Sequence, residues 1–123
     1  MSEKTKKVLV CDDSLLIRMQ LKDFISKVDA DIEVIEATNG QEAYQLFEEN
    51  QPALVFLDIV MPELNGIECL RKIKSNFEDA KVVILSSVGN KDMLKDALKA
   101  GAENFLQKPW EEDSMKKIIE TYL

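Results

Sequence analysis

The pattern of apolar residues alternates along the whole chain between that of a buried strand and that of an amphipathic helix. Continuous apolar runs at 8–11, 54–57 and 82–85 are typical of strands that are buried on both faces. Weaker, partly polar runs at 32–36 and 104–107 complete the series. Strands that alternate so regularly with helices predict an α/β architecture, a parallel sheet with helices on both faces.

An amphipathic helix is expected after each of these strands. The apolar stripes include Ile17 to Val28, Ala43 to Phe47, Ile67 to Phe77, Leu94 to Leu98, and Met115 to Tyr122. Ser14 is placed to cap the first helix, and Gly101 is placed to end the fourth. Because the fourth stripe is the weakest, we expect the fourth helix to be the easiest to displace.

The order of the strands follows from their polarity. The first, third and fourth strands are wholly apolar and should be central, whereas the second and fifth carry polar residues and suit the edges. The order 2-1-3-4-5 meets this condition and defines a flavodoxin-like doubly wound five-stranded parallel sheet. Ligands of such sheets bind outside the carboxyl ends of strands 1 and 3, where the strand order reverses.

Length and composition bound the class of protein. A chain of 123 residues predicts one domain, residues 1–123, with a substantial core. The net charge of -7 argues against direct binding to nucleic acid or to anionic membranes. No apolar stretch could span a bilayer and no signal-peptide core is present, so we expect a cytoplasmic protein. The lack of His excludes His-based zinc sites, and Cys11 and Cys69 fit small buried groups.

Polar side chains stand at the carboxyl ends of four of the expected strands. They are Asp12 and Asp13 after the first, Asp58 in the third, Ser86 in the fourth and Lys108 in the fifth. Because the carboxyl ends of parallel strands meet at one edge of a sheet, we expect these side chains to lie together. Each alone has an ordinary explanation, such as a helix-start acid, a turn-forming serine or a surface lysine. Their joint placement favours a functional site.

Three carboxylates in one crevice repel one another and attract a cation. Oxygen ligands with room for water suit Mg²⁺, which commonly shares its site with phosphate. Asp58 is then a candidate nucleophile, because a carboxylate can form an acyl phosphate whose incoming charge Mg²⁺ screens. Ser86 could donate a hydrogen bond to a phosphoryl oxygen. Lys108 could supply a positive charge, and Pro109 constrains the backbone that aims it.

These residues resemble the receiver domain of bacterial two-component response regulators. The matching segments are Val10-Cys11-Asp12-Asp13-Ser14, Leu57-Asp58-Ile59-Val60-Met61-Pro62 with Gly66, Ser86-Ser87, Gly101-Ala102, and Phe105-Leu106-Gln107-Lys108-Pro109-Trp110. They span nearly the whole chain and include all five positions above in order. The resemblance implies a phosphoacceptor switch rather than an ordinary enzyme, with self-catalysed phosphoryl transfer and autodephosphorylation.

The resemblance also implies how the phosphoryl group and the metal would be held. Asp58 would accept the phosphoryl group from a phosphohistidine on a sensor histidine kinase. Asp13 and Asp58 would bind Mg²⁺ directly, and the backbone carbonyl of Val60 would be a further ligand. Asp12 would act mainly through water.

The same resemblance implies how phosphorylation would be read. Lys108 and Ser86 would bind the phosphoryl oxygens, and the Lys108-Pro109 bond would be cis. Phe105 would be an aromatic switch that turns inward when Ser86 moves toward the phosphate. From the residues alone, Phe105 could equally be an ordinary core residue of an edge strand.

We expect an output face made of the fourth helix, the fifth strand and the fifth helix. Its candidate contacts are Lys91, Lys95, Gln107 and Trp110. Trp110 could instead simply anchor the last helix. Within the family, a monomeric stand-alone chemotaxis regulator is the leading interpretation, with the flagellar motor switch or another effector as its output partner.

Four alternatives are weighed against this interpretation. The chain could be a receiver cut from a longer regulator with a DNA-binding output domain. A flavodoxin-like FMN carrier is disfavoured because Asp12 and Asp13 would repel the FMN phosphate, and a haloacid dehalogenase-type phosphatase would have a second Asp at Val60. Intact acid, hydroxyl and lysine positions argue against a binding-only pseudo-receiver. The apolar Val60 and Val88 leave the lifetime of the phosphorylated state open, since well-known chemotaxis members have polar residues there.

Overall fold

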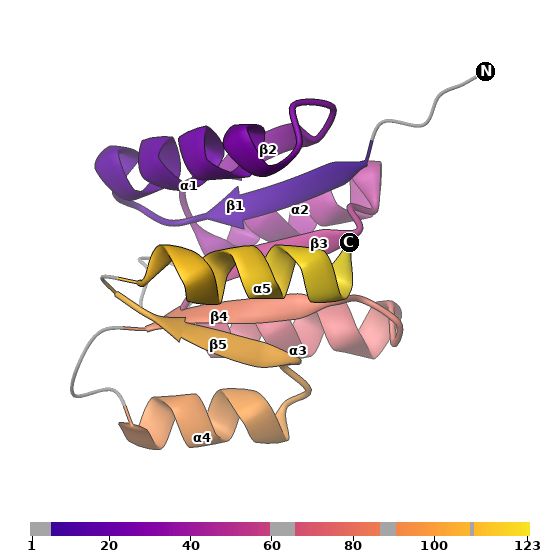
Figure 1. Cartoon of the computed structure of the whole chain (residues 1–123). Coiled ribbons are helices and arrows are strands. Elements are labelled where there is room, and N and C mark those ends of the chain that lie inside the picture. Colours follow the sequence, from indigo (N-terminus) through magenta and orange to yellow (C-terminus); the bar gives the residue numbers. More distant parts are fainter. Residues whose placement is uncertain (1–5, 60–65, 87–90, 109) are drawn as a thin grey trace.

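The computed structural model describes residues 6–59, 66–86, 91–108 and 110–123, and these form a five-stranded parallel sheet flanked by helices (Figure 1). The strand order is β2-β1-β3-β4-β5, which confirms the predicted doubly wound arrangement. In chain order the elements are β1 (Lys7–Cys11), α1 (Leu15–Val28), β2 (Glu33–Ala37), α2 (Gly40–Asn50), β3 (Leu54–Asp58), α3 (Gly66–Asn76), β4 (Val82–Ser86), α4 (Lys91–Lys99), β5 (Asn104–Gln107) and α5 (Glu112–Tyr122).

Helices cover both faces of the sheet, and Figure 1 shows α1 and α5 in front of it with α2 and α3 behind. The core is accordingly divided in two. Val8 and Val10 of β1 pack with residues of α1 and α5, whereas Leu9 and Cys11 pack with residues of α2, α3 and α4. Successive side chains of a strand point to opposite faces of the sheet. Because helices cover both faces, every residue from Val8 to Cys11 is buried, which explains the continuous apolar run.

The central and edge strands differ in burial as their polarity predicts. Every residue of β3 and β4 is buried, whereas β2 has one buried residue, Ala37, and β5 has one, Leu106. The second strand begins one residue later than its sequence pattern indicates, because the Ile32 amide donates to the Asp29 carbonyl at 3.2 Å and not to a neighbouring strand. Among the described residues, no helix combines the length and apolar character that crossing a membrane requires.

Local sequence signals set where the helices begin and end. The Ser14 hydroxyl accepts a hydrogen bond from the Ile17 amide at 3.4 Å and caps α1, as predicted. The Asn39 side chain caps α2 in the same way. Gly101 follows α4 with a φ of 114°, a left-handed conformation that favours glycine. Ala97 is the one fully buried residue of α4, which agrees with the weak apolar stripe of that segment.

Candidate functional site

The carboxyl edge of the sheet brings the predicted site residues together. Asp58 is the last residue of β3 and pairs with Leu85, while Ser86 is the last residue of β4 and pairs with Gln107. Lys108 follows β5 directly, and its amide donates to the Ser86 carbonyl at 2.7 Å. The strands therefore end nearly level, so that their polar termini share one surface.

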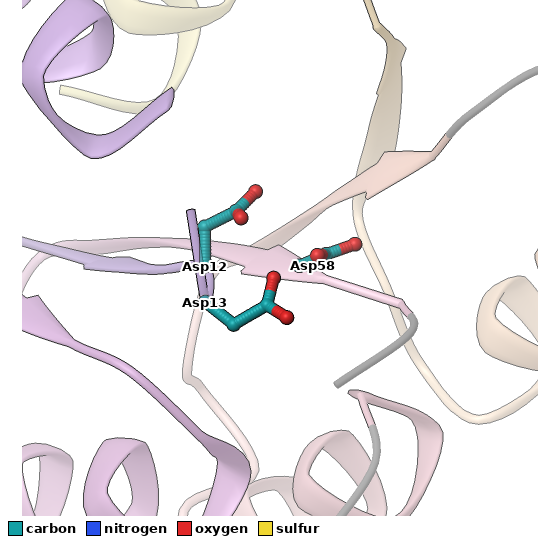
Figure 2. Close-up of side chains that lie close together, drawn as sticks. All are labelled: Asp12, Asp13 and Asp58. Carbon is teal, nitrogen blue, oxygen red and sulfur yellow. The ribbon is translucent and has the colours of Figure 1, made fainter. Parts of the chain in front are cut away.

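Three carboxylates form a cluster at this edge. Asp12, Asp13 and Asp58 each offer an oxygen, and these oxygens lie within 4.8 Å of one another. Figure 2 shows the Asp13 carboxylate directed toward Asp58, with Asp12 beside them. Asp12 is 1% exposed and Asp58 is 6% exposed, whereas Asp13 is open to solvent. Closely spaced carboxylates with one side open to water are a ligand set that fits Mg²⁺.

Lys108 links two of the three acids. Its Nζ lies 2.6 Å from Asp12 Oδ2 and 3.3 Å from Asp58 Oδ2, and its side chain is mostly buried. Burial alone would lower the pKa of Lys108, but the hydrogen bond to Asp12 and the charges of Asp58 and Asp12 outweigh it and raise the pKa. The site thus holds a charged ammonium group beside the candidate nucleophile at neutral pH.

Asp12 is held through both its side chain and its main chain. Its Oδ1 accepts from the Ser14 amide at 2.9 Å, and its own amide donates to the Ala37 carbonyl at 3.2 Å. Its carbonyl accepts from Arg18 Nη1 at 2.7 Å. The sequence interpretation missed Arg18. The available signal was its position three residues before Leu21, on the stripe that α1 buries.

Gly66 allows α3 to begin against the end of β3. Its amide donates to the Ile59 carbonyl at 3.1 Å. A Cβ at this position would overlap the Asp58 main-chain oxygen and would lie 2.6 Å from the Ile59 Cα. Any side chain would therefore displace the backbone that carries Asp58, which gives Gly66 a direct steric role in the geometry of the site.

Ser86 and Phe105 take different environments. Ser86 is 4% exposed at the end of β4. Phe105 is 41% exposed, and Leu106 fills the adjacent core position. The interpretation of Phe105 as an ordinary core residue is therefore wrong, because Phe105 is largely exposed and belongs to neither core cluster, on a strand with one buried residue. Its role as a switch stays a prediction.

Other candidate residues are exposed, half-buried or outside the described residues. Lys91, Lys95 and Gln107 are exposed, and Trp110 is half-buried against the core that α1 and α5 share. The predicted carbonyl ligand at Val60, the cis bond to Pro109 and the apolar position at Val88 lie outside the described residues.

The two cysteines are buried structural groups, as predicted. The thiols of Cys11 and Cys69 donate to the carbonyls of Asn39 and Gly40 at 3.3 and 3.2 Å. Burial raises the pKa of Cys69 to about 12, and it raises that of Cys11 as well. Thiols held in the neutral form are poor nucleophiles and poor metal ligands.

Comparison with known proteins gives consistent matches. The family model described as the response regulator receiver domain matches residues 8–120. "Chemotaxis protein CheY" of Thermotoga maritima is 42% identical over 86% of this chain and 88% of that protein. "Uncharacterized transcriptional regulatory protein YhcZ" of Bacillus subtilis is 36% identical over 94% of this chain, which covers 54% of that protein. The crystal structure of the receiver domain of NtrX from Brucella abortus matches with a TM-score of 0.88 and 30% identity, over 94% of this chain and 97% of that one.

Proposed function

Because this chain belongs to the family of response regulator receiver domains, we propose that it is a signalling switch in which Asp58 accepts a phosphoryl group from the phosphohistidine of a partner histidine kinase. The observation that carries this proposal is the position of Asp58. Its nearly buried carboxylate lies within reach of two further acids and 3.3 Å from the Lys108 ammonium.

The transfer is a displacement at phosphorus. An Asp58 carboxylate oxygen forms the new P–O bond while the P–N bond to the donor imidazole breaks, and the imidazole leaves with the bonding electron pair. Ser86 ends β4 and Lys108 directly follows the neighbouring β5, where their polar groups stabilise the charged phosphoryl oxygens. When bound, Mg²⁺ would screen the charge of the incoming group, with Asp13, Asp58 and the Val60 carbonyl as ligands and Asp12 acting through water.

The acyl phosphate then changes the output face. It adds about two negative charges beside Lys108 and Ser86. Because these two residues end different strands, their contacts with the phosphate bias the segments that lead into α4 and α5. The single fully buried residue of α4 makes this helix the easiest element to shift. Exposed Phe105 would turn inward, and Lys91, Lys95, Gln107 and Trp110 would contact the output partner.

Chemotaxis is the output that we propose, with the flagellar motor switch as a candidate partner. The support is the identity to the Thermotoga chemotaxis protein, since this chain spans 88% of that protein. The second candidate is a receiver that controls an attached output domain. It is favoured by the match to the Bacillus transcriptional regulatory protein, which is nearly twice as long as the matched region.

A phosphorylation assay tests the proposal. The protein is incubated with Mg²⁺ and a small acyl phosphate, and its intact mass is measured. We expect one phosphoryl adduct, which is absent in Asp58→Asn and retained in Asp79→Asn, an exposed acid in the segment that precedes β4. An adduct that persists in Asp58→Asn would overturn the assignment. Steady release of phosphate from simple phosphate esters would favour a phosphatase instead.

A further inference from the structure

We propose that Arg18 is a positioning residue for the magnesium site, because it fixes the peptide unit that joins the two aspartates after β1. The inference rests on the proposed function, since it concerns the ion that the acidic cluster would bind. Arg18 lies on α1 and contacts no carboxylate of that cluster in the described contacts. Its effect would therefore be indirect, through the backbone.

The contacts of Arg18 tie three elements together. Its Nη1 donates to the Asp12 carbonyl at 2.7 Å in a buried hydrogen bond. Its Nε donates to Glu36 Oε1 on β2 at 3.1 Å. The Arg18 side chain is 11% exposed, and its bond to the Asp12 carbonyl is buried, whereas its bond to Glu36 is partly buried. Lys22 approaches the other Glu36 oxygen at 3.7 Å from the solvent side.

The Asp12 carbonyl belongs to the same planar peptide unit as the Asp13 amide. Fixing that oxygen fixes the direction in which the chain enters Asp13, whose side chain is exposed. The preceding peptide unit is held separately, because the Asp12 amide donates to Ala37 at the end of β2. Without Arg18, the Asp12 carbonyl would lose a buried partner and the peptide unit could rotate. The spacing between the Asp13 and Asp58 carboxylates would then vary.

A purely electrostatic role of Arg18 and a positioning role predict opposite changes in the affinity for Mg²⁺ when Arg18 is replaced. Removing a positive charge near three carboxylates would strengthen their attraction for Mg²⁺. Glu36 already neutralises much of the Arg18 charge, so this effect is reduced. Positioning predicts weaker Mg²⁺ binding when Arg18 is replaced. The sign of the change therefore separates the two roles.

The test is a titration with MgCl₂ at constant ionic strength, followed by calorimetry or by the fluorescence of Trp110, the only tryptophan in the sequence. The proteins are wild type, Arg18→Met, Arg18→Lys and Lys22→Met, each at a temperature where circular dichroism shows it to be folded. We expect binding about 10-fold weaker in Arg18→Met, as for other residues that orient metal ligands. Arg18→Lys should fall between Arg18→Met and wild type. Lys22→Met, which removes the other Glu36 partner, should bind as wild type does.

An unchanged or tighter Mg²⁺ dissociation constant in Arg18→Met would overturn the inference, even if the variant melts at a lower temperature. A structural role alone would lower the melting temperature without changing the affinity of the folded protein. If Arg18→Met does not fold, an unchanged affinity in Arg18→Lys overturns the inference in the same way. A wild type that binds no Mg²⁺ would overturn the metal part of the proposed function as well, so the two failures are distinguishable.

Discussion

Two mostly buried lysines make different kinds of contact. One lies at the carboxyl ends of the strands, the carboxyl edge of the sheet, and the other lies at their amino ends, the amino edge. At the carboxyl edge, Lys108 bridges Asp12 and Asp58, at 2.6 and 3.3 Å. At the amino edge, Lys74 at the end of α3 donates to the Ala80 carbonyl at 2.6 Å and to Glu103 Oε1 at 2.7 Å. Both residues join segments that are far apart in the sequence, and their side chains are 16% and 18% exposed.

The difference between them lies in the balance of charge. Lys74 pairs with the carboxylate of Glu103, and its other hydrogen bonds go to neutral carbonyls. Lys108 shares its charge between two carboxylates, and a third, Asp13, stands within reach of both. A lysine whose charge is neutralised by one carboxylate links structural elements. Where three carboxylates surround one lysine, the excess negative charge can bind a further cation. This difference in charge balance favours the carboxyl edge as the site of cation binding and phosphoryl transfer.

The largest expected effect is on phosphorylation. Lys108→Met should slow formation of the acyl phosphate about 100-fold, the usual effect of removing one group that stabilises developing charge. Lys74→Met should change the rate by less than about twofold, because Lys74 contacts segments that precede β4 and β5. The measurement is the initial rate of adduct formation with Mg²⁺ and an acyl phosphate in excess. Equal rates in the two variants would remove the functional distinction between the lysines.

The next effect is on stability at the amino edge. Lys74→Met leaves the Glu103 carboxylate and the Ala80 carbonyl without their ammonium partner, which should lower the free energy of unfolding by about 2 kcal/mol. Urea denaturation of wild type and variant measures the loss. Lys81→Met is a matched control, since Lys81 is exposed at the same end of β4 and should change the free energy of unfolding by less than about 0.5 kcal/mol. A loss equal to that of the control would contradict the role assigned to Lys74.

Added magnesium should affect the two lysine variants differently. Without Lys108, the buried acids lack their ammonium partner, so Mg²⁺ should stabilise Lys108→Met more than it stabilises wild type, by about 1 kcal/mol at saturating Mg²⁺. In Lys74→Met the stabilisation should equal that of wild type. Thermal unfolding with Mg²⁺ and after its removal by a chelator gives the stabilisation by Mg²⁺ in wild type, in Lys108→Met and in Lys74→Met. A smaller increment in Lys108→Met would mean that Lys108 helps to bind the ion rather than competing with it.

The carboxyl edge was predictable from sequence, whereas the amino edge was not. Parallel strands that end in Asp58 and Ser86 must meet at one edge, so the topology alone gathers the polar residues there. The fold and strand order followed from the same periodicity. No such rule predicts the ion pair between Lys74 and Glu103, because this contact depends on how the end of α3 packs against the segment that leads into β5.

Side-chain contacts within the site could not be predicted from the sequence either. The bond between Arg18 and the Asp12 carbonyl depends on the distance between α1 and β1, which periodicity does not give. The exposure of Phe105 depends on which face of an edge strand a helix covers, and a short strand with polar ends leaves this open. Sequence patterns thus specified which residues gather, and packing determined which atoms touch.

The smallest expected effect is the alkaline titration of Lys108. Its pKa is raised above the ordinary 10.5, so the folded state holds this proton more tightly than the unfolded state does. The stability that the charged Lys108 contributes is complete below the unfolded pKa and is lost as the pH rises through the folded pKa. The loss has a slope of at most about 1.4 kcal/mol per pH unit. Above about pH 10, the unfolding free energy of wild type should therefore fall relative to that of Lys108→Met as the pH rises.

The measurement is a series of urea transitions for both proteins between about pH 9 and about pH 11.5. Ionisable groups other than Lys108 are the same in both proteins, so their contributions cancel in the difference. Lys74→Met provides the comparison at the other edge, where the ammonium has one carboxylate partner, Glu103, and otherwise neutral carbonyls. A wild-type advantage that stays constant across this range would show that the two carboxylates do not hold the Lys108 proton. The asymmetry between the two edges would then have to come from geometry rather than from charge.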